Sequence, residues 1–380
     1  MAAAILLDTF KNHLNINKAI TKDNISFRVI TTGSFAVLIT CSIIGGLTTY
    51  LGDPIVCEKK GDHRIELIEA HCWLHGTRDL DNKLGLKGVK CVEDDGDEDD
   101  KPNRNLYYEW VVLKLILSAI FLRIPAWIWS LMEGGLMSTF KREQHKILQQ
   151  SQVDFKQAVE TDATNFKNIK GSWTTRCYCI KFWLCQILAV IMLVGNFFFT
   201  NLVLENNFKL YGHNVVNFWK LSEAEKSKVV NPMCQAFPTK VGCKVILGGS
   251  SGSEDVTETL CILKHNVINE KIYLVLWFWF FVLFAIIVLQ FLLEICFVLW
   301  TDVRHLFFMQ AIGYKPLSTS MKAYLATCSF GDNFVLHQIS KNTNSTVFYD
   351  LLEYLSNPSS EQPGTVQPSG EQVGNVEMQP

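Results

Sequence analysis

Long apolar segments alternate with polar ones along this chain, and the pattern predicts four membrane-spanning helices. Residues 29–51, 182–204 and 272–293 contain no Asp, Glu, Lys or Arg. Each block has about 22 or 23 residues, the length a helix needs to cross the hydrocarbon core of a bilayer. These three segments are therefore expected to be spanning helices, and apolar sequence extends the last one to about residue 300.

The second span is less regular. Residues 106–131 are apolar overall but include Glu109, Lys114, Arg123 and Pro125. Lys114 and Arg123 are nine positions apart and fall on opposite faces of a helix. Arg123 can reach one membrane surface, whereas Lys114 lies deeper and must reach outward or face protein or water. We therefore expect this helix to be shielded from lipid by its neighbours.

Four spans divide the chain into ten segments with both termini on one side of the membrane. The expected segments are an N-terminal segment (1–28), a first span (29–51), a first extracellular loop (52–105), a second span (106–131), a cytoplasmic loop (132–179), a third span (180–204), a second extracellular loop (205–271), a fourth span (272–300), a cytoplasmic helical region (301–355) and a disordered tail (356–380). The tail is rich in Pro, Gly, Ser, Gln and Glu and has too few large apolar side chains to order itself.

Six of the twelve cysteines form two triplets, one in each long loop. An odd triplet cannot pair completely within itself, so full pairing requires at least one disulfide between the loops. Disulfides persist outside the cytosol, which makes these loops extracellular and both termini cytoplasmic. The connectivity stays open at this point. The predicted disulfide cysteines are Cys57, Cys72, Cys91, Cys234, Cys243 and Cys261.

Other chemistry is sparse. His71 and His75 flank Cys72, but the cysteines lack the close pair usual in zinc sites, so a metal centre is only a minor alternative to disulfides. Residues 93–100 include seven acids, typical of a solvated loop tip, with a weak cation site as the alternative. No catalytic motif is present, so neither an enzyme nor a cofactor is predicted. The net charge of −2 gives no indication of a nucleic-acid partner.

The first span is rich in small and hydroxyl residues. Ser34, Cys41, Gly45 and Thr48 lie near one stripe of that helix. Such a stripe indicates either close helix packing or an uncharged, water-lined wall, and both interpretations stay open. Residues 1–7 with Asp8 form a short amphipathic leader that could lie on the membrane or line a pore mouth. Four helices leave no room for a wide pore, so a pore would have to form between subunits.

Several motifs resemble those of the innexins, the invertebrate gap-junction proteins. Residues 50–57 (YLGDPIVC) are similar to the Y-x-G-x-P-I-x-C that ends the family's first span, and Cys72-Trp73 resembles its second loop cysteine followed by Trp. The second span opens with YYEWV, similar to the family's Y-Y-Q-W-V. The residues that carry this signature are Tyr107, Tyr108, Trp110 and Pro125. Glu109 and Val112 depart from the pattern, since the family usually has Gln and Pro there.

The resemblance implies an all-α membrane protein: a four-helix bundle with disulfide-linked extracellular loops and a helical cytoplasmic cap, assembled as a ring. Identical or related subunits, six or eight in number, would form a hemichannel in the plasma membrane lipid. The hemichannel would dock through its extracellular loops with one on an adjacent cell. The family's N-terminal segment forms a pore funnel, so the expected pore-lining residues are Met1, Ala2, Ala3, Ala4 and Asp8 together with the first-span stripe.

We therefore predict a gap-junction channel subunit that passes ions and small molecules. One alternative is a pannexin-like channel that never docks. Another, of a different class, is a non-conducting organiser of the tetraspanin type. The long first loop with three cysteines and the absence of a Cys-Cys-Gly motif argue against the organiser.

Overall fold

The computed structural model of the chain describes residues 22–50, 52–58, 65–79, 107–140, 152–248 and 254–357. These residues divide into two compact units. The spanning unit comprises Asp23–Gly134 and Lys181–Ile295, and the C-terminal unit includes Gly135–Ile180 and the chain from Cys296 onward. Each unit is described separately below.

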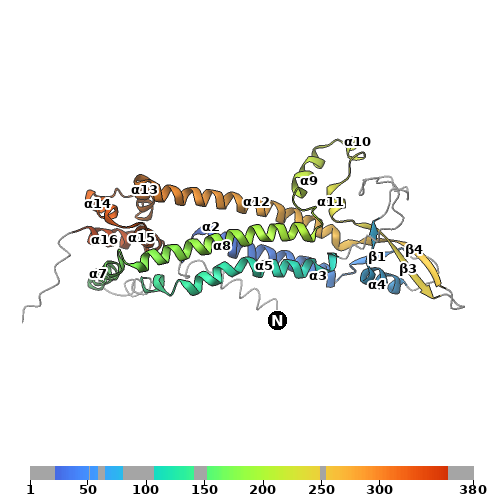
Figure 1. The fold of residues 1–380 in the computed structure, drawn as a ribbon, viewed down its shortest axis with the longest axis horizontal. Coiled ribbons are helices and arrows are strands. Elements are labelled where there is room, and N and C mark those ends of the chain that lie inside the picture. Colours follow the sequence, from blue (N-terminus) through green and yellow to red (C-terminus); the bar gives the residue numbers. More distant parts are fainter. Residues whose placement is uncertain are drawn as a thin grey trace, which may run out of the picture. The chain divides into compact units, whose positions relative to one another are not determined.

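Four helical stretches are long and apolar enough to cross a membrane (Figure 1). The candidate spans are Ile25–Leu47, Trp110–Met132, Trp173–Val203 and Lys264–Leu299. They belong to α2 (Ile25–Arg28), η1 (Val29–Gly33) and α3 (Ser34–Tyr50) taken together, to α5 (Tyr107–Met132), to α8 (Trp173–Val203) and to α12 (Lys264–Leu299). The described chain thus has the predicted four helices of spanning length, and α8 and α12 begin seven or eight residues before their predicted spans.

Aromatic side chains hold the spanning helices together. Near the start of the first span, the Phe182 ring lies 5.7 Å from Phe27 and 5.0 Å from Trp129. Towards the other end, Phe197 and Phe280 pack with centroids 5.7 Å apart. These rings bury large apolar areas, so the bundle is fixed at several levels along its length.

A four-stranded antiparallel sheet lies at the loop end of the spanning unit, which the all-α prediction did not include. The strands are β1 (Ile55–Cys57), β2 (Arg78–Asp79), β3 (Lys240–Gly248) and β4 (Glu254–Leu263), in the order β1-β4-β3-β2. The first loop supplies the outer strands and the second loop the central pair. The sheet itself therefore joins the two loops through backbone hydrogen bonds.

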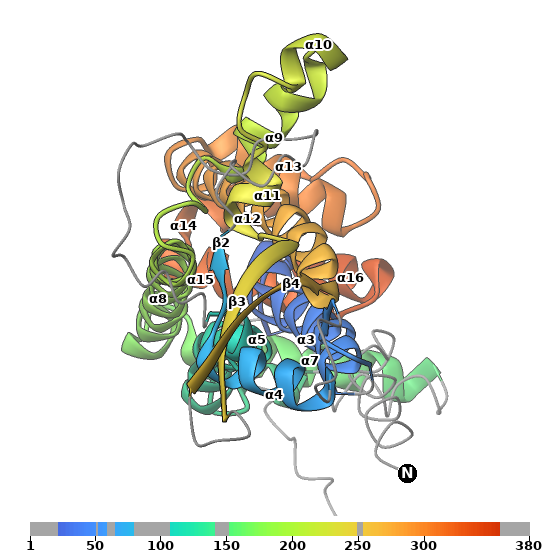
Figure 2. The same ribbon diagram turned by 90° about the vertical axis from the view of Figure 1, so that its right-hand side faces the viewer.

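Short helices complete the loops. In the first loop, α4 (Ile65–His75) packs against the sheet. In the second, α9 (Tyr211–Lys220) and α10 (Glu223–Lys226) project sideways from α12, and α11 (Pro232–Ala236) leads back to β3 (Figures 1 and 2). Asn231 caps α11 by accepting a hydrogen bond from the Met233 amide, and Pro232 occupies the first helical position, where no amide proton is required.

The C-terminal unit is a cluster of helices. It contains the start of α8 together with α7 (Gln152–Ile169), α13 (Thr301–Ala311), α14 (Thr319–Thr327), α15 (Phe330–Asn342) and α16 (Ser345–Ser356). Ser318, Ser329 and Asn344 each cap a helix by accepting a backbone N–H at its first turn. The central helix is α15, most of whose residues are buried.

The buried Asp332 carboxylate joins α15 to the start of α8. One oxygen accepts the Gly171 amide at 2.9 Å and the Thr175 hydroxyl at 2.8 Å. The other accepts the Ser329 amide at 2.9 Å and its hydroxyl at 2.7 Å. Burial raises the pKa of Asp332, but these hydrogen bonds outweigh it and leave the pKa below its usual value. The carboxylate is therefore charged and fully engaged.

Candidate functional site

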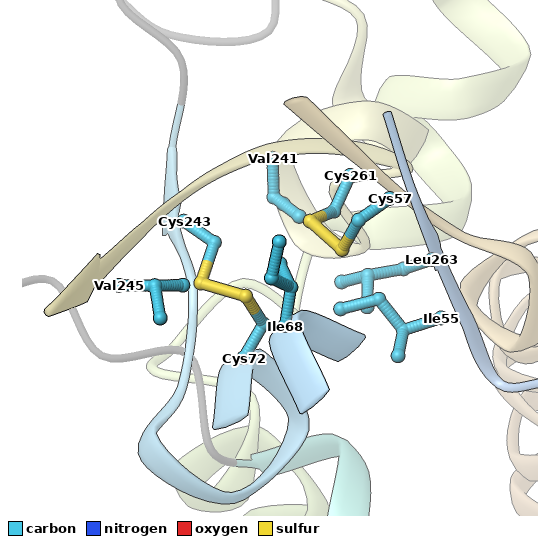
Figure 3. Close-up of a cluster of buried hydrophobic side chains, with 9 residues drawn as sticks. All are labelled: Ile55, Cys57, Ile68, Cys72, Val241, Cys243, Val245, Cys261 and Leu263. Carbon is cyan, nitrogen blue, oxygen red and sulfur yellow. A yellow bond between two sulfur atoms is a disulfide. The ribbon is translucent and has the colours of Figure 1, made fainter. Parts of the chain in front are cut away.

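The loop core is the buried cluster between the sheet and α4 (Figure 3). Its strand residues follow the two-residue period of a β-strand, which places alternate side chains on the face towards α4. From α4, Ile68 and Cys72 lie one turn apart and face the sheet. The strand members are Ile55, Cys57, Val241, Cys243, Val245, Cys261 and Leu263.

Two disulfides cross this core, and each joins one loop to the other. Cys57 and Cys261 stand directly opposite each other in the β1–β4 pair, with Cα atoms 4.0 Å apart. Cys72 of α4 is bonded to Cys243 of β3, with Cα atoms 5.8 Å apart. Cys234 is also disulfide-bonded, whereas Cys91 lies outside the described residues. Both described disulfides connect the two loops, as the odd number of cysteines in each triplet requires for at least one of them.

The sulfur atoms of Cys57, Cys72 and Cys261 lie within 4.8 Å of one another, an arrangement that could suit a metal ion. All three sulfurs are in disulfides, however, and a metal ligand must be a thiolate. The sulfur cluster is therefore a consequence of two neighbouring disulfides. On α4, the ring centres of His71 and His75 lie 4.4 Å apart, with the ring planes inclined by 42°.

Two of the motif residues lie where the loops meet the fourth span. The Pro54 carbonyl accepts the Lys264 amide at 3.1 Å, at the first residue of α12. The Trp73 ring lies edge-on to His265 at 5.3 Å. Both residues thus tie the first loop to the end of α12, next to the loop core.

Three residues of the small-residue stripe, Ser34, Cys41 and Gly45, face the interior of the spanning unit. Ser34 is buried and accepts the indole N–H of Trp279 at 3.1 Å. Cys41 is buried, and a Cβ placed on Gly45 would lie 3.8 Å from Val112 and 3.9 Å from Ile272. These positions favour helix packing over a water-lined wall. The exposed residues of the described part of α3 lie on another face: Thr40, Ile43, Ile44 and Leu47.

Lys114 faces protein, which is one of the two environments expected for it. Only 4% of the side chain is exposed, and its ammonium donates a hydrogen bond to the Thr200 hydroxyl at 2.6 Å. The same nitrogen lies 5.3 Å from the centre of the Tyr273 ring. Lys114 of α5 therefore links α8 and α12 across the interior of the bundle.

A polar cluster links the start of the first span to α12, and the sequence did not reveal it. Glu294 accepts hydrogen bonds from the amide groups of Asn24 at 3.1 Å and Gln290 at 2.6 Å. Ser26 donates to the Gln290 carbonyl oxygen at 2.9 Å. Glu294 is therefore paired within the protein. The spacing of Gln290 and Glu294 was a visible signal, but Asn24 is 270 positions away in sequence.

Several predicted site residues fall outside the part of the chain that the structure describes. They are Met1, Ala2, Ala3, Ala4, Asp8, Cys91 and the acidic residues 93–100. Thr48, Tyr107 and Tyr108 lie in described helices, although the positions of their side chains are not described. Trp110 is exposed near the start of α5, and Pro125 lies inside that helix.

These features define a class: a mostly helical membrane protein with four candidate spans and two loops at one end joined by disulfides. The sequence model of the innexin family matches residues 23–358. The chain belongs to the innexin family. Among its relatives, innexin inx2 of Schistocerca americana is 29% identical over 342 residues, which cover 88% of this chain and 92% of that protein. Innexin shaking-B of Drosophila melanogaster is 26% identical over 364 residues, covering 93% and 95% of the two chains.

Proposed function

We propose that this protein is a gap-junction channel subunit that passes ions and small molecules between adjacent cells. Family membership supports the class of protein. The observation that carries the proposal is the loop core, in which two disulfides and one sheet unite two distant loops. Docking between cells requires a surface that keeps its shape, and a cross-linked sheet provides one at the end of the bundle.

The disulfides also support an orientation. Because they persist outside the cytosol, the loop core lies outside the cell and both chain termini lie in the cytoplasm. The free cysteines of the described chain agree with this arrangement. Those of the C-terminal unit (Cys177, Cys179, Cys296 and Cys328) belong to the cytoplasmic side. That unit forms the cytoplasmic cap.

A third disulfide between the loops follows from a count of the cysteines. The structure pairs four of them, records Cys234 as bonded, and leaves six free. Of the twelve cysteines, Cys91 is the one left to pair with Cys234. The first, second and third cysteines of the first loop would then pair with the third, second and first cysteines of the second loop. This order is expected for two segments that run antiparallel to each other.

The pore lies between subunits of a ring, and the exposed face of α3 with the N-terminal segment lines it. Ser34, Cys41 and Gly45 are occupied by packing, so the α3 contribution moves to Thr40, Ile43, Ile44 and Leu47. Transport is passive diffusion. The hydrogen bonds of Asn24 and Gln290 to Glu294 hold the start of the first span against α12.

The function is tested by dye transfer and conductance between paired cells that express the protein. We expect coupling between apposed cells. Current in single cells without coupling between cells would contradict docking and favour a pannexin-like channel. Correct surface assembly with no current in either format would favour a non-conducting organiser.

The pore wall is tested with a membrane-impermeant thiol reagent on single-cell hemichannel currents. In a Thr40→Cys variant the reagent is expected to reduce the current. The parent protein is a matched control, because its adjacent Cys41 is buried. If the reagent also reduced the current of the parent protein, and Cys41→Ser abolished that effect, the pore wall would be the stripe that contains Cys41.

A further inference from the structure

The helices α9 and α10, here called the lateral arm, extend sideways from the spanning unit. Figures 1 and 2 show the arm running across the direction of α12 and away from α3 and α5. Its base is fixed to α12 at two points. The Trp277 indole donates to the Lys209 carbonyl at 3.2 Å, and the Tyr211 hydroxyl donates to the Glu270 carbonyl at 3.1 Å.

A glycine allows the arm to lie directly on α12. A Cβ at Gly212 would fall 2.2 Å from a ring carbon of Trp277, which is closer than any side chain tolerates. The Trp277 ring therefore packs flat against the backbone of α9. This packing and the two hydrogen bonds together hold the base of the arm against α12.

The turn before the arm fixes its direction. Glu205 and Asn206 have positive φ angles of 50° and 67°, which reverses the chain after α8. The Asn201 side chain bridges the turn by accepting the Lys209 amide at 2.8 Å and donating to the Asn206 side chain at 2.8 Å. Phe208 is fully buried beside them. The arm thus leaves the bundle in one defined direction.

The base of the arm lies at the depth of the membrane surface. Trp277 is five residues into the apolar segment 272–293 of α12. At 1.5 Å per residue this is about 7 to 8 Å from the end of the hydrocarbon stretch. A helix that starts here and runs across α12 must lie along the surface of the bilayer, at the boundary between headgroups and hydrocarbon.

The two faces of α9 differ in the way a surface helix requires. Tyr211 and Val215 are buried, the Tyr211 ring lies 5.9 Å from Phe237 at the end of α11, and Trp219 continues their stripe at the same four-residue spacing. Trp219 itself is 53% exposed. The opposite face carries the exposed polar residues His213, Asn214 and Asn217. An exposed indole on the apolar side of a helix at this depth is typical of a membrane-interface anchor.

The neighbouring surface is the one that faces lipid. Leu210, at the base of the arm, is 56% exposed, and the large side chains of Phe198, Leu202, Val275 and Phe278 on α8 and α12 are also exposed. Lys220 follows Trp219 and is exposed. We propose that the lateral arm lies on the bilayer leaflet on the side of the loop core, with Trp219 inserted among the phospholipids and Lys220 at the level of their phosphate groups.

The test places a photoreactive benzoylphenylalanine at position 219 or 217 of the full-length protein in nanodiscs of tritiated phosphatidylcholine. After irradiation, we expect lipid labelling at position 219 to be several-fold higher than at 217, on the polar face. Both positions are exposed, and mobility on non-reducing gels verifies that the disulfides have formed.

Two results would overturn the proposal. Equal or absent lipid labelling at positions 219 and 217 would show that the arm does not rest on the leaflet. Cross-linking of position 219 into a subunit dimer, in place of lipid, would assign the arm to contact with a second copy of the chain in the ring.

Discussion

The loop core and the C-terminal unit both join residues that are far apart in sequence, but they do so with different chemistry. The loop core does so with disulfides across separations of 204 and 171 residues. The C-terminal unit uses the Asp332 carboxylate, which holds Thr175 from 157 positions away, and keeps Cys328 as a buried free thiol. The contrast is the one expected from the orientation proposed above, with the loop core in an oxidising environment and the C-terminal unit in a reducing one.

The largest effect is expected from Cys72→Ser, which removes one of the two disulfides of the loop core. The change leaves Cys243 unpaired in a buried core and removes one of the loop-to-loop bonds. Loss of a native disulfide typically costs about 2 to 5 kcal/mol, so we expect coupling between paired cells to be abolished. Cys328→Ser is the matched control and should retain coupling. Full coupling by Cys72→Ser would refute the role given to the loop core.

A smaller effect is expected from Asp332→Ala, which removes the carboxylate that joins α15 to the start of α8 in the C-terminal unit. The substitution leaves the Gly171 and Ser329 amides without their side-chain acceptor, whereas the Thr175 hydroxyl keeps the Ser172 carbonyl at 3.2 Å as a second acceptor. Hydrogen bonds to a charged group contribute about 1.5 to 3 kcal/mol each, so the C-terminal unit should open more often. The readout is faster alkylation of the buried Cys328, measured by peptide mass spectrometry.

The exposed Asp302 provides the control for this experiment, and Asp302→Ala should leave Cys328 protected. Mobility of both variants on non-reducing gels should be unchanged, because the disulfides belong to the other unit. Unchanged Cys328 protection in Asp332→Ala would mean that apolar packing alone holds the C-terminal unit.

The smallest effect is a pH dependence confined to the C-terminal unit. His337 lies among Phe297, Phe307 and Phe308, and burial, with a smaller contribution from Lys341, lowers its pKa to about 3. The unfolded chain binds a proton near pH 6.5 and the folded one does not, so stability falls as pH drops from about 6.5 towards 3. The loss is at most about 1.4 kcal/mol per pH unit.

Hydrogen exchange of the α15 amides, corrected for intrinsic rates, measures this effect between pH 7 and pH 5. Exchange should rise at pH 5 in the native chain and rise less in His337→Phe, which keeps the ring but cannot be protonated. Amides of β3 and β4 serve as the internal reference. An equal rise in both units would assign the acid response to groups other than His337.

The sequence predicted the parts of this fold that depend on local composition. Four apolar blocks gave four spanning helices, and the odd triplets required bridges between loops. The outer strands β1 and β2 were missed because they are short and pair across the two loops. The central pair, β3 and β4, lies within the second loop, and the alternation of Val241, Cys243 and Val245 was a usable signal for it. The stripe of Ser34, Cys41 and Gly45 identified a helix face correctly, but periodicity does not show whether protein or water covers that face. Asn24 and Glu294 meet only through the folded bundle.

The long separations closed by the disulfides have a consequence for how the chain is made. When Cys57 and Cys72 emerge from the ribosome, their partners lie 204 and 171 residues further along. At a synthesis rate of about 5 to 20 residues per second, each thiol waits roughly 10 to 40 s while two more spans are made and inserted. During this interval the first loop is a substrate for wrong pairing, so its maturation depends on disulfide exchange in the secretory pathway. Slow insertion of α5 or α8 would therefore first appear as mispaired cysteines in the first loop, which contains neither helix.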